Sequence, residues 1–178
     1  MKRNATTKMT KTYMVTSLFL LMEHQPFTAI TISDIAKKAG VNRSTYYRHF
    51  NSKEEIVYYF VEQVLDEFSK TISTNIDLYH YLLQLFSHLK KYQKEFLLLC
   101  QNKLSLFYLT ALNKNLDISS HQAYLNAYHI GGIFNCSLLW FSRNMIDTPE
   151  KMAQISLEIL PDNFVPYLIS KKSANFNN

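Results

Sequence analysis

At 178 residues, the chain is long enough to bury a hydrophobic core of its own. Hydrophobic residues make up 47% of it and aromatic residues 14%, which excludes a disordered chain. The net charge of +5 is unevenly distributed, because residues 1–53 carry nine Lys or Arg against two acidic residues and residues 54–178 carry ten against twelve. A basic N-terminal part is suited to contact with phosphate, although a merely solvated basic segment has the same composition.

The scarcity of helix-breaking residues predicts long helices. Only three glycines and four prolines occur, too few for the many turns of a β protein, and we therefore expect an all-α fold. The most apolar later segment, residues 130–141, is interrupted by Asn135 and Ser137 and is shorter than the roughly 18 residues of a membrane span. No cleavage site follows the apolar segment 13–22, so we expect a cytoplasmic protein without a membrane anchor.

The first predicted helix has one apolar face, formed by Val15, Leu18, Phe19 and Met22. Pro26 ends this helix, because the residue before a proline is disfavoured in the α conformation. A short second helix follows, with Thr31 as its N-cap and Asp34 as the partner in a capping box. Its predicted buried residues are Ile32, Ile35, Ala36 and Ala39.

Gly40 stands where a left-handed residue would end the second helix. Asn42 caps a third predicted helix over residues 43–49, from which Tyr46 and Phe50 face inward. Ser52 and Glu55 form a second predicted capping box, at the start of a longer fourth helix. Two short helices joined by a turn that contains glycine are typical of a helix-turn-helix.

The order of these residues is specific. The sequence TISDIAKKAGVNRSTYYRHF over residues 31–50, followed by SKEE over residues 52–55, resembles the N-terminal domain of TetR-family regulators. The resemblance runs from about residue 10 to residue 60. It implies a three-helix helix-turn-helix DNA-binding domain, followed by a helical-bundle regulatory and dimerisation domain. We place these domains at residues 1–52 and 53–178.

The resemblance also implies how single residues would meet double-stranded DNA. Arg43, Ser44 and Thr45 would enter the major groove, with Arg43 able to contact a guanine through two hydrogen bonds. Four other residues would contact phosphates, namely Thr31, Tyr47, His49 and Lys53. His49 has an alternative role in packing or capping. Lys37, Lys38 and Arg48 are as well explained as solvated surface charges.

After residue 60 we expect helices over residues 53–73, 77–91, 93–113 with a break near Asn102, 119–144 and 149–160. Ser119 or Ser120 would cap the helix over 119–144, in which Ala123, Ala127 and Gly131 share one face. Thr148 would cap the last helix, with Pro149 in its first turn. By analogy with the family, these last two helices would pair with a second subunit, and we take Phe134 as an interface residue. Such a homodimer suits a palindromic operator.

The helices between could enclose a site for a small-molecule effector. The candidate residues are aromatic, although aromatic residues at helical spacing are more often plain core: Tyr79, Tyr81, Phe86, Phe96, Phe107, Tyr108, Tyr124, Tyr128 and Phe134. The function predicted is therefore a homodimeric repressor released by a small molecule. The alternative is a DNA-bound regulator whose C-terminal bundle binds a partner protein.

Chemical motifs are sparse. His80 and His88, like His121 and His129, are eight residues apart and share a helical face only in part, and no pair of cysteines has metal-binding spacing. Neither a phosphate-binding glycine loop nor a nucleophile motif occurs. We expect no metal, no cofactor and no catalytic residues.

Overall fold

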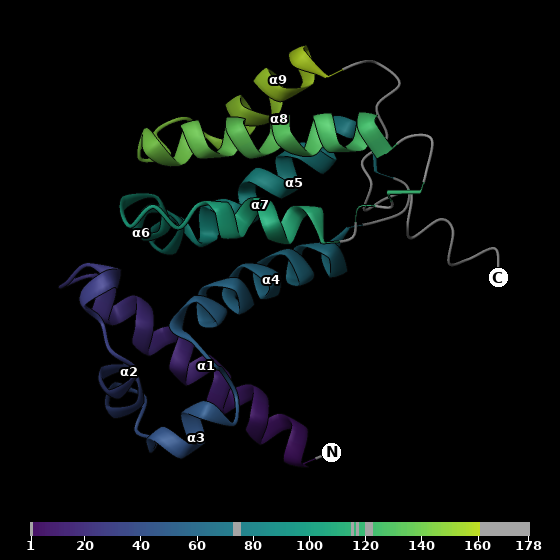
Figure 1. Ribbon diagram of the computed structural model, residues 1–178. Helices are drawn as coiled ribbons and strands as arrows, with labels where there is room; N and C mark the ends of the chain where they lie inside the picture. The colour runs from purple at the N-terminus through teal and green to yellow at the C-terminus, as the bar shows by residue number, and fades with distance from the viewer. Residues whose placement is uncertain (1, 73–75, 115, 117, 120–122, 161–178) are drawn as a thin grey trace.

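A computed structural model describes residues 2–72, 76–114, 116, 118–119 and 123–160, with side chains from residue 6 onward. Every regular element in these residues is helical, which confirms the predicted all-α fold (Figure 1). The elements are α1 Lys2–Met22, the 3-10 turn η1 Phe27–Ala29, α2 Ile32–Lys38, α3 Arg43–Tyr47, α4 Lys53–Thr71, α5 Leu78–Lys91, α6 Gln93–Gln101, α7 Leu106–Asn113, α8 Ala123–Ser142 and α9 Pro149–Ile159. None of them is long and apolar enough to cross a lipid bilayer.

Helices α1, α2 and α3 form the N-terminal unit. α1 contacts α2 and α4, and α2 contacts α3. Leu18 of α1, Ile35 of α2 and Tyr46 of α3 are fully buried and Phe50 is nearly so, as their spacing predicts. α1 begins at Lys2 and so extends well before the apolar face that predicted it.

Helix α4 joins this unit to the rest of the molecule. It contacts α1, α5 and α7. The Phe60 ring lies 4.6 Å from that of Phe19 on α1, and 5.9 and 6.1 Å from those of Tyr92 and Phe96. Because α4 belongs to both cores, a domain boundary at residue 52 stays a prediction.

The remaining helices form the larger unit. α5 packs on α9, while α6 and α7 both pack on α8. α8 and α9 lie at the opposite end of the molecule from α2 and α3 (Figure 1). The predicted break near Asn102 is present, since α6 ends at Gln101 and Lys103 takes a positive φ of 59° before α7. Thr148 caps α9 with Pro149 in its first turn, as predicted, whereas the suggested cap Ser120 lies outside the described residues.

Most of the predicted pocket aromatics are core residues. Tyr81, Phe86, Phe96, Tyr108 and Phe134 are buried and contact other rings. Tyr79 and Phe107 are half-buried, and Tyr124 and Tyr128 are exposed.

The choice of Phe134 as an interface residue is wrong. Its ring lies 5.9 Å from that of Tyr108, and the residue is only 6% exposed within its own chain. α8 is apolar on nearly all sides, so its sequence pattern does not distinguish the face that packs inward from the outer one.

Candidate nucleic-acid interface

Local hydrogen bonds fix both ends of α2. The Thr31 hydroxyl accepts from the Asp34 N–H at 3.1 Å, and the Asp34 carboxylate accepts from the Thr31 N–H at 2.9 Å, which completes the predicted capping box. At the other end of α2, Gly40 has φ +68°, a conformation that L side chains rarely adopt. The Val41 N–H then donates to the Ala36 carbonyl at 2.9 Å and turns the chain toward α3.

Helix α3 is shorter than predicted. Asn42 caps it, accepting from the Thr45 N–H at 2.7 Å, but the helix ends at Tyr47 rather than at residue 49. The N–H groups of His49 and Phe50 both donate to the Tyr46 carbonyl, so the chain tightens into a turn there. His49 consequently lies in the turn after α3.

The exposed side of α3 carries the predicted base-reading residues. Arg43 and Ser44 are exposed and Thr45 is half-buried, while Tyr46 is buried beneath them. α3 lies at the outer end of the molecule, where no other described helix covers it (Figure 1). A helix placed in this way has the access that a DNA groove requires.

The polar groups on this surface differ in whether they make hydrogen bonds within the chain. The Ser44 hydroxyl donates to Asn42 Oδ1 at 2.8 Å, and the Arg48 guanidinium donates to the Thr45 hydroxyl at 2.7 Å. Neither Arg43 nor the Tyr47 hydroxyl makes a hydrogen bond or ion pair within the described residues. Arg43 and Tyr47 are therefore the groups on α3 most available to an external partner.

His49 is surrounded by positive charge. Burial lowers the pKa of its imidazole, and the charges of Lys11 and Arg48 lower it further. The Lys11 ammonium lies over the rings of Phe50 and Tyr59, 5.1 and 4.7 Å from their centroids. A neutral His49 has one N–H to donate, and a nearby phosphate would favour its protonated form.

Lys53 has a structural role that its sequence context does not reveal. Its ammonium donates to the carbonyls of Phe27, Thr28 and Ile30 at 2.6, 3.3 and 2.8 Å. The same group lies 4.5 Å from the centroid of the Phe27 ring. The three N–H donors of the ammonium are thus used inside the chain, and its contact with phosphate stays a prediction.

The predicted capping box of α4 is only half formed. The Ser52 hydroxyl accepts from the Glu55 N–H at 3.2 Å. The Glu55 carboxylate, however, accepts from the backbone and side-chain N–H groups of Asn51, at 2.8 and 3.0 Å, rather than from Ser52. These two bonds lower the pKa of Glu55 and hold the turn between α3 and α4.

Arg48 is equally well explained from the sequence as a solvated surface charge, but the structure places it beside the predicted DNA-contacting residues. It is exposed at the end of α3, and its bond to Thr45 places its guanidinium next to the predicted base-reading residues. The three-residue spacing between Thr45 and Arg48 is the signal that would have identified it.

His80 and His88 each have a different partner. His80 pairs with Asp77 at 2.7 Å, and His88 Nε2 donates to the Val64 carbonyl at 2.8 Å. Within the described ranges, no group of three His, Cys, Asp or Glu side chains could hold a metal ion.

Known proteins share both the helix-turn-helix segment and the fold. Residues 20–59 match the family model described as bacterial regulatory proteins, tetR family. The chain is 34% identical over 62 residues to the uncharacterized HTH-type transcriptional regulator YxbF of Bacillus subtilis. It is 33% identical over 54 residues to the HTH-type transcriptional regulator EthR of Mycobacterium tuberculosis. These matches cover 33% and 30% of this chain, but only 16% and 25% of the relatives' own lengths.

Most of the chain has a structural counterpart. The solved structure of the dihydroxyacetone kinase operon activator DhaS aligns with a TM-score of 0.57 at 18% identity, over 84% of this chain and 93% of that one. At this identity the likeness concerns the fold alone. Residues 20–59 thus match the helix-turn-helix segment of the tetR family of bacterial regulatory proteins, and the chain shares the all-helical fold of DhaS.

Proposed function

We propose that the chain is a cytoplasmic homodimer that binds a pseudo-palindromic DNA operator and represses transcription until a small-molecule effector releases it. The observation that supports DNA binding is that Arg43 and Tyr47 on the outer surface of α3 make no hydrogen bond or ion pair within the described residues. They lie in the N-terminal part of the chain, which has nine basic and only two acidic residues. Such an excess of positive charge attracts the phosphate backbone in a salt-dependent way.

Base reading is assigned to the first turn of α3 and phosphate contact to its flanks. Arg43 is the first residue of the helix, and its free guanidinium has the geometry to donate two hydrogen bonds to a guanine. Tyr47, one helical turn further along, and His49, in the turn after α3, would contact the backbone on either side of the groove. Ser44, Thr45 and Arg48 would add contacts after exchanging hydrogen bonds that they now make within the chain.

Dimerisation is assigned to the outer face of α8 together with α9. Tyr124, Tyr128 and Leu139 of α8 are 91%, 77% and 59% exposed, and Ile159 of α9 is 67% exposed. The three residues of α8 share one face by helical spacing, and large exposed apolar side chains on one face support a protein contact there. A second copy of the chain is the occupant that a two-fold symmetric operator requires.

Release by an effector rests on the connection between the two units. α4 contacts α1 and α7, so a change in the packing of the larger unit alters the position of α3 relative to the dimer axis. An effector can change DNA affinity only if it binds the two arrangements with different affinity.

The alternative, in which a partner protein binds the C-terminal bundle, draws on the same exposed tyrosines. Tyr124 and Tyr128 would then contact the partner instead of a second copy. DhaS is an operon activator, so the test must also separate activation from repression. A reporter gene placed behind the operator would separate repression from activation.

Fluorescence anisotropy of the purified chain with duplexes tiled across the region upstream of its own gene tests DNA binding. Tight binding to one tile that weakens steeply between two salt concentrations is expected. The double variant Arg43→Ala/Tyr47→Ala should lose this binding, whereas Lys91→Ala, an exposed lysine at the end of α5, should retain it. Binding by the double variant equal to that of the parent chain would refute the assigned surface.

A further inference from the structure

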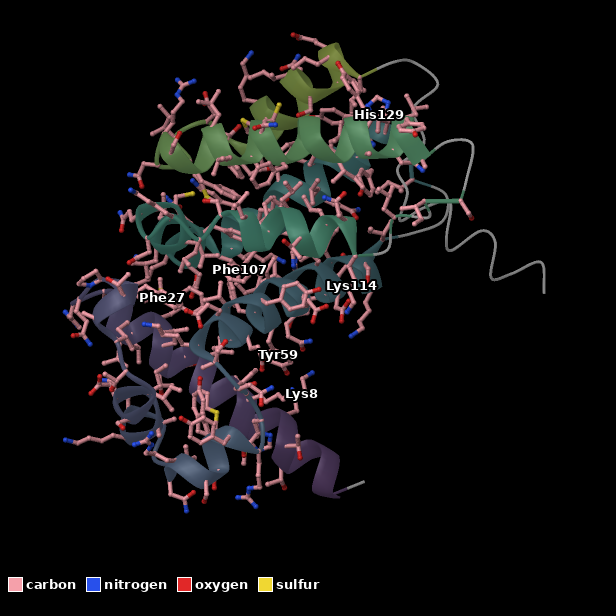
Figure 2. The ribbon with its side chains drawn as sticks, in the orientation of Figure 1. Lys8, Phe27, Tyr59, Phe107, Lys114 and His129 are labelled. Atoms are coloured by element: carbon pink, nitrogen blue, oxygen red, sulfur yellow. The ribbon has the colours of Figure 1, made fainter. Side chains whose placement is uncertain are left out.

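A groove of about 310 Å³ lies between α1, α4 and α6, where the helix-turn-helix unit meets the larger helical unit. Its floor is mainly apolar and is formed by Val15, Phe19, Leu20, Tyr59, Phe60 and Leu98. None of the nine aromatic residues that sequence reasoning suggested as pocket lining belongs to it. In Figure 2, Lys8 and Tyr59 are labelled at the side of the groove formed by α1 and α4.

The charged residues of the groove are unequally engaged. Glu23 of α1 pairs with Lys94 of α6 at 2.7 Å, so these two charges neutralise each other. Glu67 of α4 accepts a hydrogen bond from the Tyr92 hydroxyl. Glu95 of α6 makes no ion pair or hydrogen bond within the described residues.

Glu67 and Glu95 both act on the Tyr92 phenol. Burial is the main cause that raises the pKa of Tyr92 to about 12, and the hydrogen bond and negative charge of Glu67 and the charge of Glu95 raise it further. Glu67 is thus hydrogen-bonded to Tyr92, Glu95 lines the same groove, and the Tyr92 ring lies 5.9 Å from that of Phe60. On the opposite wall, the exposed Lys8 is the remaining positive charge, at the end of a long side chain that can extend into solvent.

We propose that this groove binds a small organic cation with an apolar or aromatic body. Its volume reaches the lower end of the range for small-molecule sites, about 300 Å³. Phe19 and Tyr92 are aromatic rings in its lining that can attract a cation electrostatically, and Glu67 and Glu95 supply the complementary charge. The Tyr59 ring already has the Lys11 ammonium 4.7 Å from its centroid and is left to the apolar floor. The apolar floor would take up the body of the ligand.

Such a ligand would contact both units of the molecule at once. It would favour the arrangement in which α1 and α6 keep their present separation, and so would fix the position of the helix-turn-helix. This regulatory consequence rests on the proposed DNA-binding function, whereas the binding site itself does not.

A titration of the full chain with phenyltrimethylammonium, followed by ligand-observed NMR, tests the site. tert-Butylbenzene is the neutral control, because it has nearly the same shape without the charge. We expect the cation to bind at least about ten-fold more tightly than the neutral compound. Equal affinity for the two compounds, or no saturable binding of the cation, would overturn the proposal.

Two variants locate the binding. Glu95→Gln should weaken binding of the cation about five-fold and leave the neutral compound unaffected, while Glu158→Gln, an exposed glutamate on α9, should change neither. Thr16→Trp places a bulky side chain in the groove from an exposed position of α1, and should abolish binding without unfolding the chain. Retained affinity in a folded Thr16→Trp variant would show that the cation binds elsewhere.

A final titration separates this inference from the proposed function. DNA affinity is measured with and without saturating phenyltrimethylammonium. A change in affinity that Thr16→Trp abolishes would support both the site and its consequence. Binding of the cation with no change in DNA affinity would overturn the regulatory consequence alone, and a chain that binds the cation but no DNA would refute the proposed function while leaving the site in place.

Discussion

At the scale of single residues, Arg43 and Tyr47 differ from their neighbours on α3 because neither polar group is used within the described chain. Replacing Arg43 with Ala should cost about 1–3 kcal/mol in operator binding and relax the preference for one base pair. Tyr47→Phe, which keeps the ring and removes the hydroxyl, should weaken all duplexes to the same degree. Competition with single-base operator variants measures the difference, and equal losses on every sequence would refute base reading by Arg43.

Lys53 allows a second contrast, between a structural tie and a phosphate contact. Its ammonium bonds three carbonyls of the segment before α2, so Lys53→Met should lower the free energy of unfolding by about 1–3 kcal/mol. Chemical denaturation measures this loss. If the variant keeps its stability and instead lowers the salt slope of DNA binding by about one, then the contact with phosphate is the main role.

His49 makes DNA binding depend on pH. In the free chain its pKa lies below the usual 6.5, because burial and the charges of Lys11 and Arg48 disfavour the protonated form. The free chain therefore loses stability as the pH falls below 6.5. A DNA phosphate next to the ring would raise the pKa of His49. DNA binding is then accompanied by uptake of a proton by His49 at any pH between its pKa values in the free and the bound chain.

DNA affinity should consequently increase as the pH falls through this window and level off below the pKa of the free chain. Anisotropy titrations between pH 7.5 and 5.5 measure the change at constant ionic strength. His49→Gln should remove most of the pH dependence, and an unaltered pH profile in this variant would place His49 away from the phosphates.

At the scale of elements, the sequence predicted correctly those helix ends that are determined by hydrogen bonds between residues close in the chain. The caps Thr31, Asn42 and Thr148 and the left-handed Gly40 lie where the sequence placed them, because each makes its bonds within a few residues. The carbonyl partners of Lys53 are 23 to 26 residues away in sequence, so the spacing of residues along the chain could not predict these hydrogen bonds. α3 ends earlier than its cap and apolar spacing predict, because the His49 and Phe50 N–H groups both donate to the Tyr46 carbonyl, and Glu55 of the next helix then holds Asn51.

One hydrogen bond joins the end of α6 to the segment before α2. Asn102 Oδ1 accepts from the Phe27 N–H at 2.7 Å, while its Nδ2 donates to the Leu98 carbonyl at 2.9 Å. The Phe27 carbonyl is held from the other side by Lys53 at 2.6 Å. The helix-turn-helix unit is thus tied to α4 and to α6 through the same residue.

Asn102→Ala should leave the Phe27 N–H without a partner, lower stability by about 1–3 kcal/mol and speed hydrogen exchange at this amide. Asn113→Ala is a matched control, because the Asn113 side chain donates only to the Leu109 carbonyl of its own helix. NMR exchange rates measure the effect. Comparable protection of the Phe27 amide in both variants would show that the tie does not constrain the segment.

At the scale of the whole molecule, the question is which surface of the larger unit meets a second copy. The order of helices followed from the sequence, but the outer face of α8 did not, because apolar side chains surround this helix. Tyr124, Tyr128 and Leu139 are exposed and lie on one face by helical spacing, whereas Phe134 packs inward on Tyr108. The four aromatic or aliphatic side chains therefore belong to two different surfaces.

This difference predicts opposite outcomes for two substitutions on one helix. Tyr128→Asp places a charge on the exposed face and should give a folded monomer that binds the operator far more weakly, because the two half-sites are no longer held together. Phe134→Asp buries a charge in the aromatic core and should destabilise the fold by several kcal/mol, on the order of 3–5. Sedimentation velocity and circular dichroism together distinguish the two results. Leu106→Asp, at a 67% exposed position of α7, should remain dimeric and folded, so a dimer that persists in Tyr128→Asp would assign the interface to another surface.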